Sequence, residues 1–393
     1  MNVYADHAAT TPMRACAKEA MLEALEDFGN PSSIHSAGRL AAVRLESARK
    51  EVAELLNCRP SEIYFTSGGT EADNWALRGV AELMALKGRK GGHIITSAIE
   101  HHAILHTARY LEKQGFEVTL LDVHENGLVT AQQVADAIRE DTCLVTVMYA
   151  NNEIGTIEPI AEIGKIAHEH GVLFHTDAVQ AYTQVPIDVE AMNIDMMSTS
   201  GHKINGPKGI GFLYIRKGVK IKSFIHGGAQ ERHRRAGTEN VTGIIGLAKA
   251  AEIATANMKE RTAEEIKVRD HLIERIEKEI PYAKLNGDRV KRLPNNVNFS
   301  FQFVEGESML ILLDSKGICA SSGSACTSGS LDPSHVLLAI GLPHEIAHGS
   351  LRLTISDQIT MEDADYVVDN LKEIVNHLRE MSPLYEDFIK KNK

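Results

Sequence analysis

The sequence predicts an α/β protein with a largely parallel central sheet and a second, smaller α+β domain. Short apolar runs rich in β-formers alternate with helical patterns between Glu62 and Ile215, which is typical of a doubly wound sheet covered by helices. After about Met258 strands and helices interleave differently, which indicates a separate unit. A chain of 393 residues, 43% of them hydrophobic, is also too long for one ordinary core.

The elements of the first unit follow in order along the chain. A long helix is expected from Ser36 to Leu56, because Leu45, Ala48 and Val52 recur at steps of three and four. Segments with helical spacing, such as 101–115, separate most of the strands that follow. These strands are expected at 62–66, 93–97, 116–121, 143–149, 172–177, 195–200 and 210–215.

The second unit begins after about residue 257. A charged helix through Glu279 leads to a strand in "NNVNFSFQF" and a helix near 307–314. The strand "LRLTI" and a last helix with Val367, Leu371 and Ile374 on one face complete it. We therefore expect a large domain over residues 13–257. The small domain would take residues 1–12 and 258–393, so that the N-terminus packs with the C-terminal part of the chain.

Composition argues against several classes of partner. The charge sum is -11, from 42 basic and 53 acidic residues without long runs of one sign, so neither nucleic acid nor an anionic membrane is an expected partner. The start, "MNVYADHAATTP", lacks the features of a signal peptide, and no window approaches the roughly 20 apolar residues of a membrane span. A cytoplasmic location is expected.

Five cysteines without a CxxC fit reduced thiols better than disulfides or a metal site.

Two stretches after predicted strands carry possible ligand-binding chemistry, because ligands of open α/β sheets bind beyond the carboxyl ends of the strands. In "SGGTEADN", Gly69 and Thr70 lead into a helix whose backbone N–H groups and dipole suit a phosphate. The same residues also suit a simple helix cap with flexible glycines. Asp177 ends the strand "VLFHTD", and Gln180 follows at the distance of one helical turn, where a structural cap is again the alternative.

The stretch "STSGHKINGPKGIG", at the end of the strand 195–200, is the most informative. Ser200 and His202 supply polar donors beside a lysine. A lysine among glycine and apolar neighbours can have its ammonium desolvated and its pKa lowered, which Schiff-base chemistry requires. Spacing alone leaves Lys203 and Lys208 as alternatives for this role.

One thiol stands apart from the others. The stretch "SSGSACTSGS" places Cys326 among glycine, serine, threonine and alanine, with neither helical nor strand periodicity. It has no second cysteine at metal-ligand spacing, since Cys319 is seven residues away with no third ligand near. The composition predicts a loop, about residues 321–333, with little packing to restrain it.

Taken together, these motifs resemble the cysteine desulfurases of the group with a long cysteine loop, the iron-sulfur cluster and nitrogen-fixation type. The resemblance covers nearly the whole chain, from "YADHAATTPM" to "SPLYEDF". It implies a fold-type I enzyme that depends on pyridoxal phosphate, forms a homodimer and converts L-cysteine to L-alanine. The motifs, in order, are "SGGTEADN", "EHHAILH", "NNEIG", "HTDAVQ", "SGHKINGPKGIG", "RRAGTEN", "NVNFSF", "EGESMLILLD" and "SSGSACTSGS".

The resemblance also implies roles for single residues. Lys203 matches the lysine that bonds to the cofactor, which leaves Lys208 without a special role. Asp177 would pair with the pyridinium nitrogen and Gln180 with the ring hydroxyl oxygen, while His101 would lie over the ring and transfer protons. The phosphate would be held by Gly69, Thr70, Ser200, His202 and, from the other subunit, Thr238.

Substrate contacts follow in the same way. Asn152 would meet both cofactor and substrate, and Arg352 would clamp the substrate carboxylate as a planar fork. Cys326 would take the sulfur as a persulfide and carry it to an acceptor protein, such as an iron-sulfur scaffold or a tRNA-thiolation protein. A thiol that must reach both a crevice and the surface explains why it sits in a loop of this composition.

Two alternatives remain open at the level of sequence. Another fold-type I enzyme, such as a selenocysteine lyase or an aminotransferase, would keep Lys203 and Asp177 but would not need Cys326 in a loop. A metal or iron-sulfur carrier would need clustered thiolates, which the spacing of the cysteines does not provide.

Overall fold

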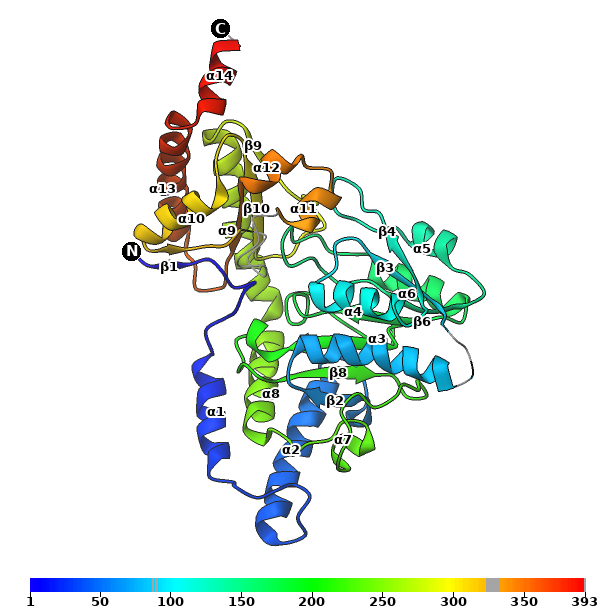
Figure 1. The fold of residues 1–393 in the computed structure, drawn as a ribbon. Helices are drawn as coiled ribbons and strands as arrows, with labels where there is room; N and C mark the ends of the chain where they lie inside the picture. Colours follow the sequence, from blue (N-terminus) through cyan, green and yellow to red (C-terminus); the bar gives the residue numbers. More distant parts are fainter. Residues whose placement is uncertain (87, 89–90, 323–332, 392–393) are drawn as a thin grey trace.

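The centre of the molecule is a seven-stranded sheet. The computed structural model describes residues 1–393 apart from 87, 89–90, 323–332 and 392–393. The strand order is β2-β8-β7-β6-β5-β3-β4 (Figure 1). Neighbouring strands are parallel except at β8, which runs antiparallel to both β2 and β7. The predicted α/β class with a mainly parallel sheet is thereby confirmed.

The strands of this sheet lie where the sequence predicts them. They are β2 Ile63–Thr66, β3 His93–Ser97, β4 Glu117–Leu121, β5 Thr142–Thr146, β6 Leu173–Asp177, β7 Met196–Ser200 and β8 Gly211–Ile215. The inner strands are buried almost throughout, whereas the edge strand β4 is only partly buried. Such continuous apolar runs, in place of strict alternation, are expected where helices cover both faces of a sheet.

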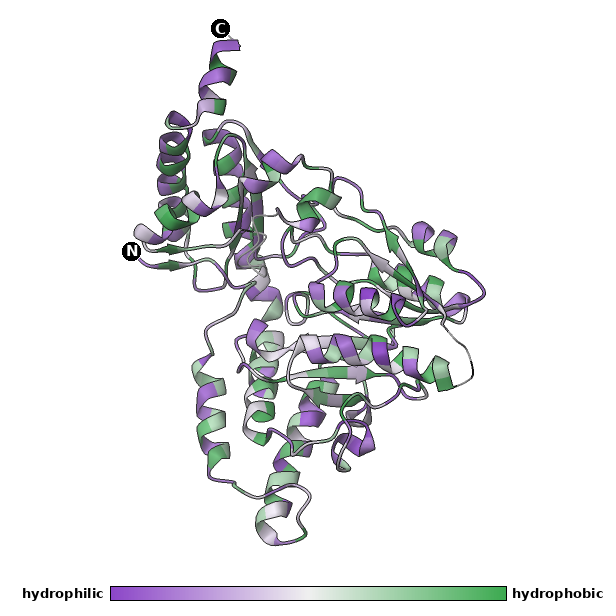
Figure 2. Cartoon of the chain, viewed as in Figure 1, coloured by the Kyte–Doolittle hydropathy of each residue, from purple (hydrophilic) through white to green (hydrophobic). Residues whose placement is uncertain are grey.

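Helices cover both faces. Val52 of α2, Ile163 of α6 and Leu247 of α8 belong to one core, and Trp75 of α3 and Ile104 of α4 belong to another. The helices also carry hydrophilic residues, as expected when a helix packs with one face only (Figure 2). Their bounds are α1 Ala15–Leu25, α2 Ser36–Glu54, α3 Gly69–Leu86, α4 His102–Glu112, α5 Ala131–Ala137, α6 Ile160–Glu169, α7 Gln230–His233 and α8 Val241–Ala256.

The C-terminal part forms a separate core around a small antiparallel sheet of order β12-β10-β9. Val3 and Ala5 join this core, and β1 (Val3–Tyr4) pairs in parallel with β11 (Ile318–Cys319). The division into two domains near residue 257 stays a prediction. The remaining large elements are α9 Met258–Glu279, β9 Ala283–Leu285, β10 Asn296–Phe301, α10 Gly306–Ser315, β12 Ser350–Thr354 and α13 Met361–Glu380.

Some elements go beyond what the sequence predicts. The chain continues after α13, the helix expected to be the last, into α14 (Pro383–Lys391), in which no side chain is buried. Two short helices, α11 (His335–Ala339) and α12 (His344–His348), precede β12. A helix of five residues has too few turns to show a period. None of the described helices combines the length and apolar composition needed to span a lipid bilayer.

Candidate active site

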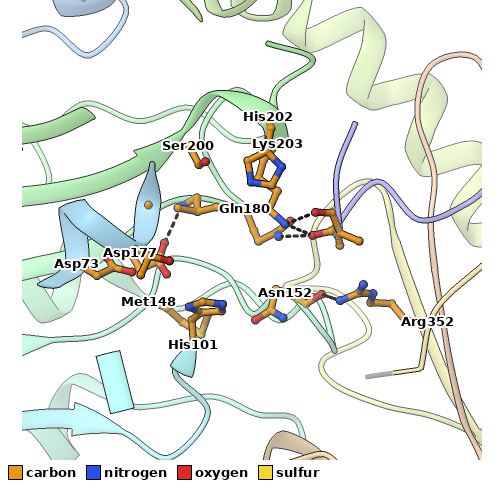
Figure 3. A pocket seen from close by; sticks show the side chains of 15 residues that line it. Asp73, His101, Met148, Asn152, Asp177, Gln180, Ser200, His202, Lys203 and Arg352 are labelled. Atoms are coloured by element: carbon orange, nitrogen blue, oxygen red, sulfur yellow. Dashed lines mark hydrogen bonds between the residues drawn. The ribbon is translucent and has the colours of Figure 1, made fainter. Parts of the chain in front are cut away.

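The carboxyl ends of the parallel strands converge on one cavity. β6 ends at Asp177, β7 ends at Ser200, and α3 begins at Gly69 shortly after β2. The cavity has a volume of about 340 Å³ and is drawn in Figure 3. Its lining comprises Ala8, Ala9, Gly69, Thr70, Asp73, His101, Met148, Asn152, Asp177, Val179, Gln180, Ser200, His202, Lys203 and Arg352.

Most residues singled out from the sequence therefore lie together, and among the described residues Thr238 is the exception. Thr238 lines a different, smaller cavity with Ser67 and Gly209. Cys326 lies outside the described residues. Lys208 is exposed and is not part of the lining, so the geometry favours Lys203 over Lys208 as the lysine of this site.

The N-terminal segment runs past Lys203. The Lys203 ammonium donates hydrogen bonds to the carbonyl oxygens of Ala8 and Ala9, the latter at 2.7 Å. Gln180 Nε2 donates to the same Ala8 oxygen at 3.1 Å, and Thr11 Oγ1 donates to the His202 carbonyl at 2.8 Å. The sequence predicts only a packing role for residues 1–12. Their part in the cavity rests on backbone carbonyls, which leave no signal in residue types.

Two buried carboxyl groups face each other in the cavity. Asp177 Oδ1 accepts a hydrogen bond from Val179 N at 2.9 Å, burial raises the pKa of Asp177 to about 6, and the nearby Lys203 ammonium opposes that shift. Asp73 is 1% exposed, and burial together with the Asp177 charge raises its pKa well above the usual range. Like charges this close cannot both persist in a buried site, so Asp73 holds a proton while Asp177 is the anionic partner.

His101 completes this cluster. One ligand-type atom from each of Asp73, His101 and Asp177 lies within 4.8 Å of the others. His101 caps the N-terminus of α4, and its Nδ1 accepts a hydrogen bond from Ala103 N at 3.1 Å. Burial and the Lys203 charge lower the pKa of His101, so the imidazole is neutral at neutral pH and carries its proton on Nε2.

Arg352 approaches from the other side of the cavity. It lies on β12, and its side chain is 3% exposed. Its Nη1 donates to the carbonyl oxygen of Asn152 at 3.0 Å (Figure 3), and its Nη2 forms an ion pair with Asp6 Oδ1 at 3.0 Å. The backbone of Arg352 also forms an antiparallel bridge with Ser321, the first residue of the predicted cysteine loop. The cavity thus has an anion-binding group in addition to its lysine.

Glu100, directly before His101, is a third buried carboxyl group, and it does not line the cavity. It is fully buried, and its Oε1 accepts hydrogen bonds from Ser97 Oγ at 2.6 Å and Met148 N at 2.9 Å. Burial raises the pKa of Glu100 to about 8 from the usual 4.5. The folded protein then holds the group neutral while the unfolded chain ionises it, so this group's contribution to stability is lost as pH rises from 4.5 to 8.

Glu100→Gln should remove the loss of stability that Glu100 causes as the pH rises, because glutamine does not ionise. The free energy of unfolding of the variant, relative to wild type, should rise by about 3 kcal/mol between pH 5 and pH 8, measured by urea unfolding. Glu112→Gln, an exposed change on the adjoining helix α4, should show no such trend. A difference that stays constant with pH for Glu100→Gln would mean that Glu100 is not held neutral.

The fold, with a lysine and a buried aspartate at the carboxyl edge of the sheet, is typical of fold-type I enzymes, a class that uses pyridoxal phosphate. The family model of the class-V aminotransferases matches residues 3–367. Curated relatives include Cysteine desulfurase IscS of Methanosarcina thermophila, 58% identical over 97% of this chain and 94% of the relative. Cysteine desulfurase IscS of Clostridium botulinum strain Hall is 56% identical over 99% of this chain and 98% of the relative.

Solved structures agree with the sequence relatives. A NifS-like protein superimposes with a TM-score of 0.89 at 38% identity, covering 96% of this chain and all of that chain. The structure of SspA in complex with cysteine gives a TM-score of 0.81 at 38% identity, over 91% of this chain and 99% of that chain. The chain belongs to the class-V aminotransferase family and, within it, to the cysteine desulfurases.

Proposed function

We propose that the cavity described above is the desulfuration site, where L-cysteine becomes L-alanine and its sulfur passes to Cys326 as a persulfide. The observation that carries the proposal is the placement of Lys203 beside the buried Asp177, with Arg352 in the same lining. A base, an anionic partner for a ring nitrogen and an anchor for an amino-acid carboxylate are thereby within one cavity. The sulfur would then be delivered to acceptor proteins.

The residues present fit pyridoxal phosphate. Its pyridine nitrogen needs a buried anionic partner, and Asp177 is one; its phosphate needs a helix N-terminus and hydroxyl groups, which Gly69, Thr70 and Ser200 supply. A Cβ added at Gly69 would lie 2.7 Å from Val179 Cγ2, so the backbone packs closely where a phosphate would approach. The cofactor supplies an electron sink that acidifies the α-proton of an amino acid bonded to it.

The chain's own groups then have distinct tasks. Lys203 would bond to the cofactor and, when free, move the proton at the substrate Cα, with the Ala8 and Ala9 carbonyls holding its ammonium. The neutral imidazole of His101, with its proton on Nε2, would exchange protons over the ring. Gln180 and His202 would add hydrogen bonds to the cofactor, and Arg352 would bind the carboxylate of L-cysteine.

The sulfur-transfer step is balanced without an added oxidant. The Cys326 thiolate attacks the sulfur of L-cysteine, a sulfur–sulfur bond forms, and the bond between that sulfur and the substrate Cβ breaks. The electron pair and a proton end on the alanine methyl carbon. Cys326 is left as a persulfide. The thiolate of an acceptor protein can then attack the outer sulfur and take it up.

The wider setting is part of the same proposal. We place the enzyme in the cytoplasm as a homodimer, in which Thr238 of one subunit completes the phosphate site of the other. Its acceptors would be an iron-sulfur scaffold or a tRNA-thiolation protein. The separate cavity that Thr238 lines is compatible with a role across a subunit boundary.

The experiment is direct. Purified protein loaded with pyridoxal phosphate is incubated with L-cysteine and a reductant, and alanine and sulfide are measured together. We expect equal amounts of both, and the cofactor absorbance should change on adding L-cysteine. Alanine from L-selenocysteine but none from L-cysteine would instead make the protein a selenocysteine lyase, and no alanine from either would end the proposal.

A further inference from the structure

Asp6 is the residue that neutralises Arg352. The Arg352 side chain is 3% exposed, and the Asp6 carboxylate, whose side chain is 21% exposed, meets its Nη2 at 3.0 Å. A buried guanidinium without a counter-charge is costly, so this ion pair offsets the cost of burying the arginine in the cavity wall. Asp6 does not line the cavity, and no role was assigned to it from the sequence motifs.

The backbone fixes Asp6 in this place. Asp6 forms a parallel bridge with Thr354, two residues beyond Arg352 on the strand β12. His7 N donates to the Thr354 carbonyl at 3.2 Å, and Ala8 N donates to Thr354 Oγ1 at 2.8 Å. The partner of Arg352 is therefore attached to the same strand that carries the arginine, so the pair moves as one body.

Asp6 and Asn152 occupy only some of the N–H donors of the Arg352 guanidinium. Arginine has five N–H donors in one plane. Nη1 is directed at the Asn152 carbonyl and Nη2 at Asp6, which fixes the orientation of that plane. The Nε atom is buried and has no hydrogen-bond partner among the described residues. The N–H groups of the guanidinium that neither partner takes are the ones a ligand could use.

We propose that Asp6 is a positioning residue that orients the Arg352 guanidinium so that its remaining N–H groups receive the α-carboxylate of the amino-acid substrate. The inference rests on the proposed function, in which Arg352 binds that carboxylate. Asp6 itself touches neither substrate nor cofactor. It acts by holding the plane of the fork, and a fork of fixed plane binds a carboxylate more tightly than a free one.

The test is Asp6→Asn, which keeps the shape and removes the charge. We expect KM for L-cysteine to rise about tenfold while kcat changes by less than twofold, because the lost interaction serves binding and not chemistry. The dissociation constant of L-alanine, followed by the cofactor absorbance, should rise by a similar factor. Asp6→Glu keeps the charge but displaces it by one methylene, and it should give an intermediate KM.

Asp357→Asn is the matched control. Asp357 pairs with Arg14 at 2.9 Å and also ties the N-terminal segment to the chain beyond β12, but at side chains that are 30% and 23% exposed. If tethering the segment were all that mattered, both asparagine variants would shift KM alike, and the positioning role would be wrong. A lower KM for Asp6→Asn would also overturn it, since Asp6 would then compete with the substrate.

Two further readouts separate this inference from the function on which it rests. Thermal unfolding and cofactor absorbance of Asp6→Asn must match wild type, which shows that the variant is folded and loaded with cofactor. If they do not match, the KM of Asp6→Glu is used to test the positioning role. Arg352→Lys should raise KM more than Asp6→Asn does. An unchanged KM in Arg352→Lys would refute the carboxylate role of Arg352, whereas a raised KM there with wild-type KM in Asp6→Asn would refute the role of Asp6 alone.

Discussion

Replacement of Lys203 by alanine should lower the rate of alanine formation from L-cysteine by roughly 10³-fold or more. Lys203 is the only lysine among the described residues that line the cavity, and both tasks assigned to it, bonding to the cofactor and moving the α-proton, require an amine. The measurement is alanine released per enzyme over time. A second readout is covalent attachment of the cofactor after borohydride reduction, located by peptide mass spectrometry, which should be lost from position 203.

Lys208→Ala supplies the control for this result. Lys208 follows five residues later, is exposed and does not line the cavity. The variant should keep both its turnover and its borohydride-labelled peptide at Lys203. An inactive Lys208→Ala beside an active Lys203→Ala would show that the wrong lysine has been assigned to the cofactor.

Cys326→Ser should separate binding from sulfur transfer. A serine hydroxyl does not attack sulfur as a thiolate does, so alanine release should fall by roughly 10³-fold. The variant should still bind pyridoxal phosphate and still change its absorbance on addition of L-cysteine, because those events use Lys203, Asp177 and Arg352. Single-turnover alanine release and persulfide labelling on the intact protein provide the measurement.

Cys319→Ser is the matched change for the thiol. Cys319 is exposed on β11, seven residues before Cys326, and does not line the cavity. We expect near wild-type alanine release from it. Should Cys326→Ser desulfurate L-cysteine at the wild-type rate, the persulfide would have to form elsewhere, and loss of activity in Cys319→Ser would then identify the alternative position.

The sheet and much of the candidate site could be predicted from the sequence because each rests on a local pattern. Buried strands appear as apolar runs, and the residues directly after them, such as Asp177 and Lys203, must lie at one edge of a parallel sheet. Single-sequence patterns did not choose between Lys203 and Lys208. The resemblance to a family indicated Lys203 as the lysine that bonds to the cofactor, and the cavity lining, which includes Lys203 and not Lys208, favours the same residue.

What the sequence did not reveal depends on distant contacts. Asp73 lies one turn into α3, where an aspartate is indistinguishable from a solvated helix residue until the packing buries it beside Asp177. Asp6 has a role only through its ion pair with Arg352, which is far away in the sequence. Ala8 and Ala9 contribute only backbone oxygens, which accept hydrogen bonds from Lys203. The helix α14 was also missed; none of its residues is buried, although Tyr385 and Phe388 contact the ring of Phe303.

The pairing of Asp6 with Arg352 joins residues 346 positions apart in the chain. Contacts of such separation form late in folding, since the entropy of closing the long loop must be overcome before they add any stability. During synthesis the central sheet can assemble once β8 has emerged, but the carboxylate-binding wall has to wait for β12. A nascent chain could therefore hold the lysine and the aspartate of the site in place long before it is able to recognise an amino acid.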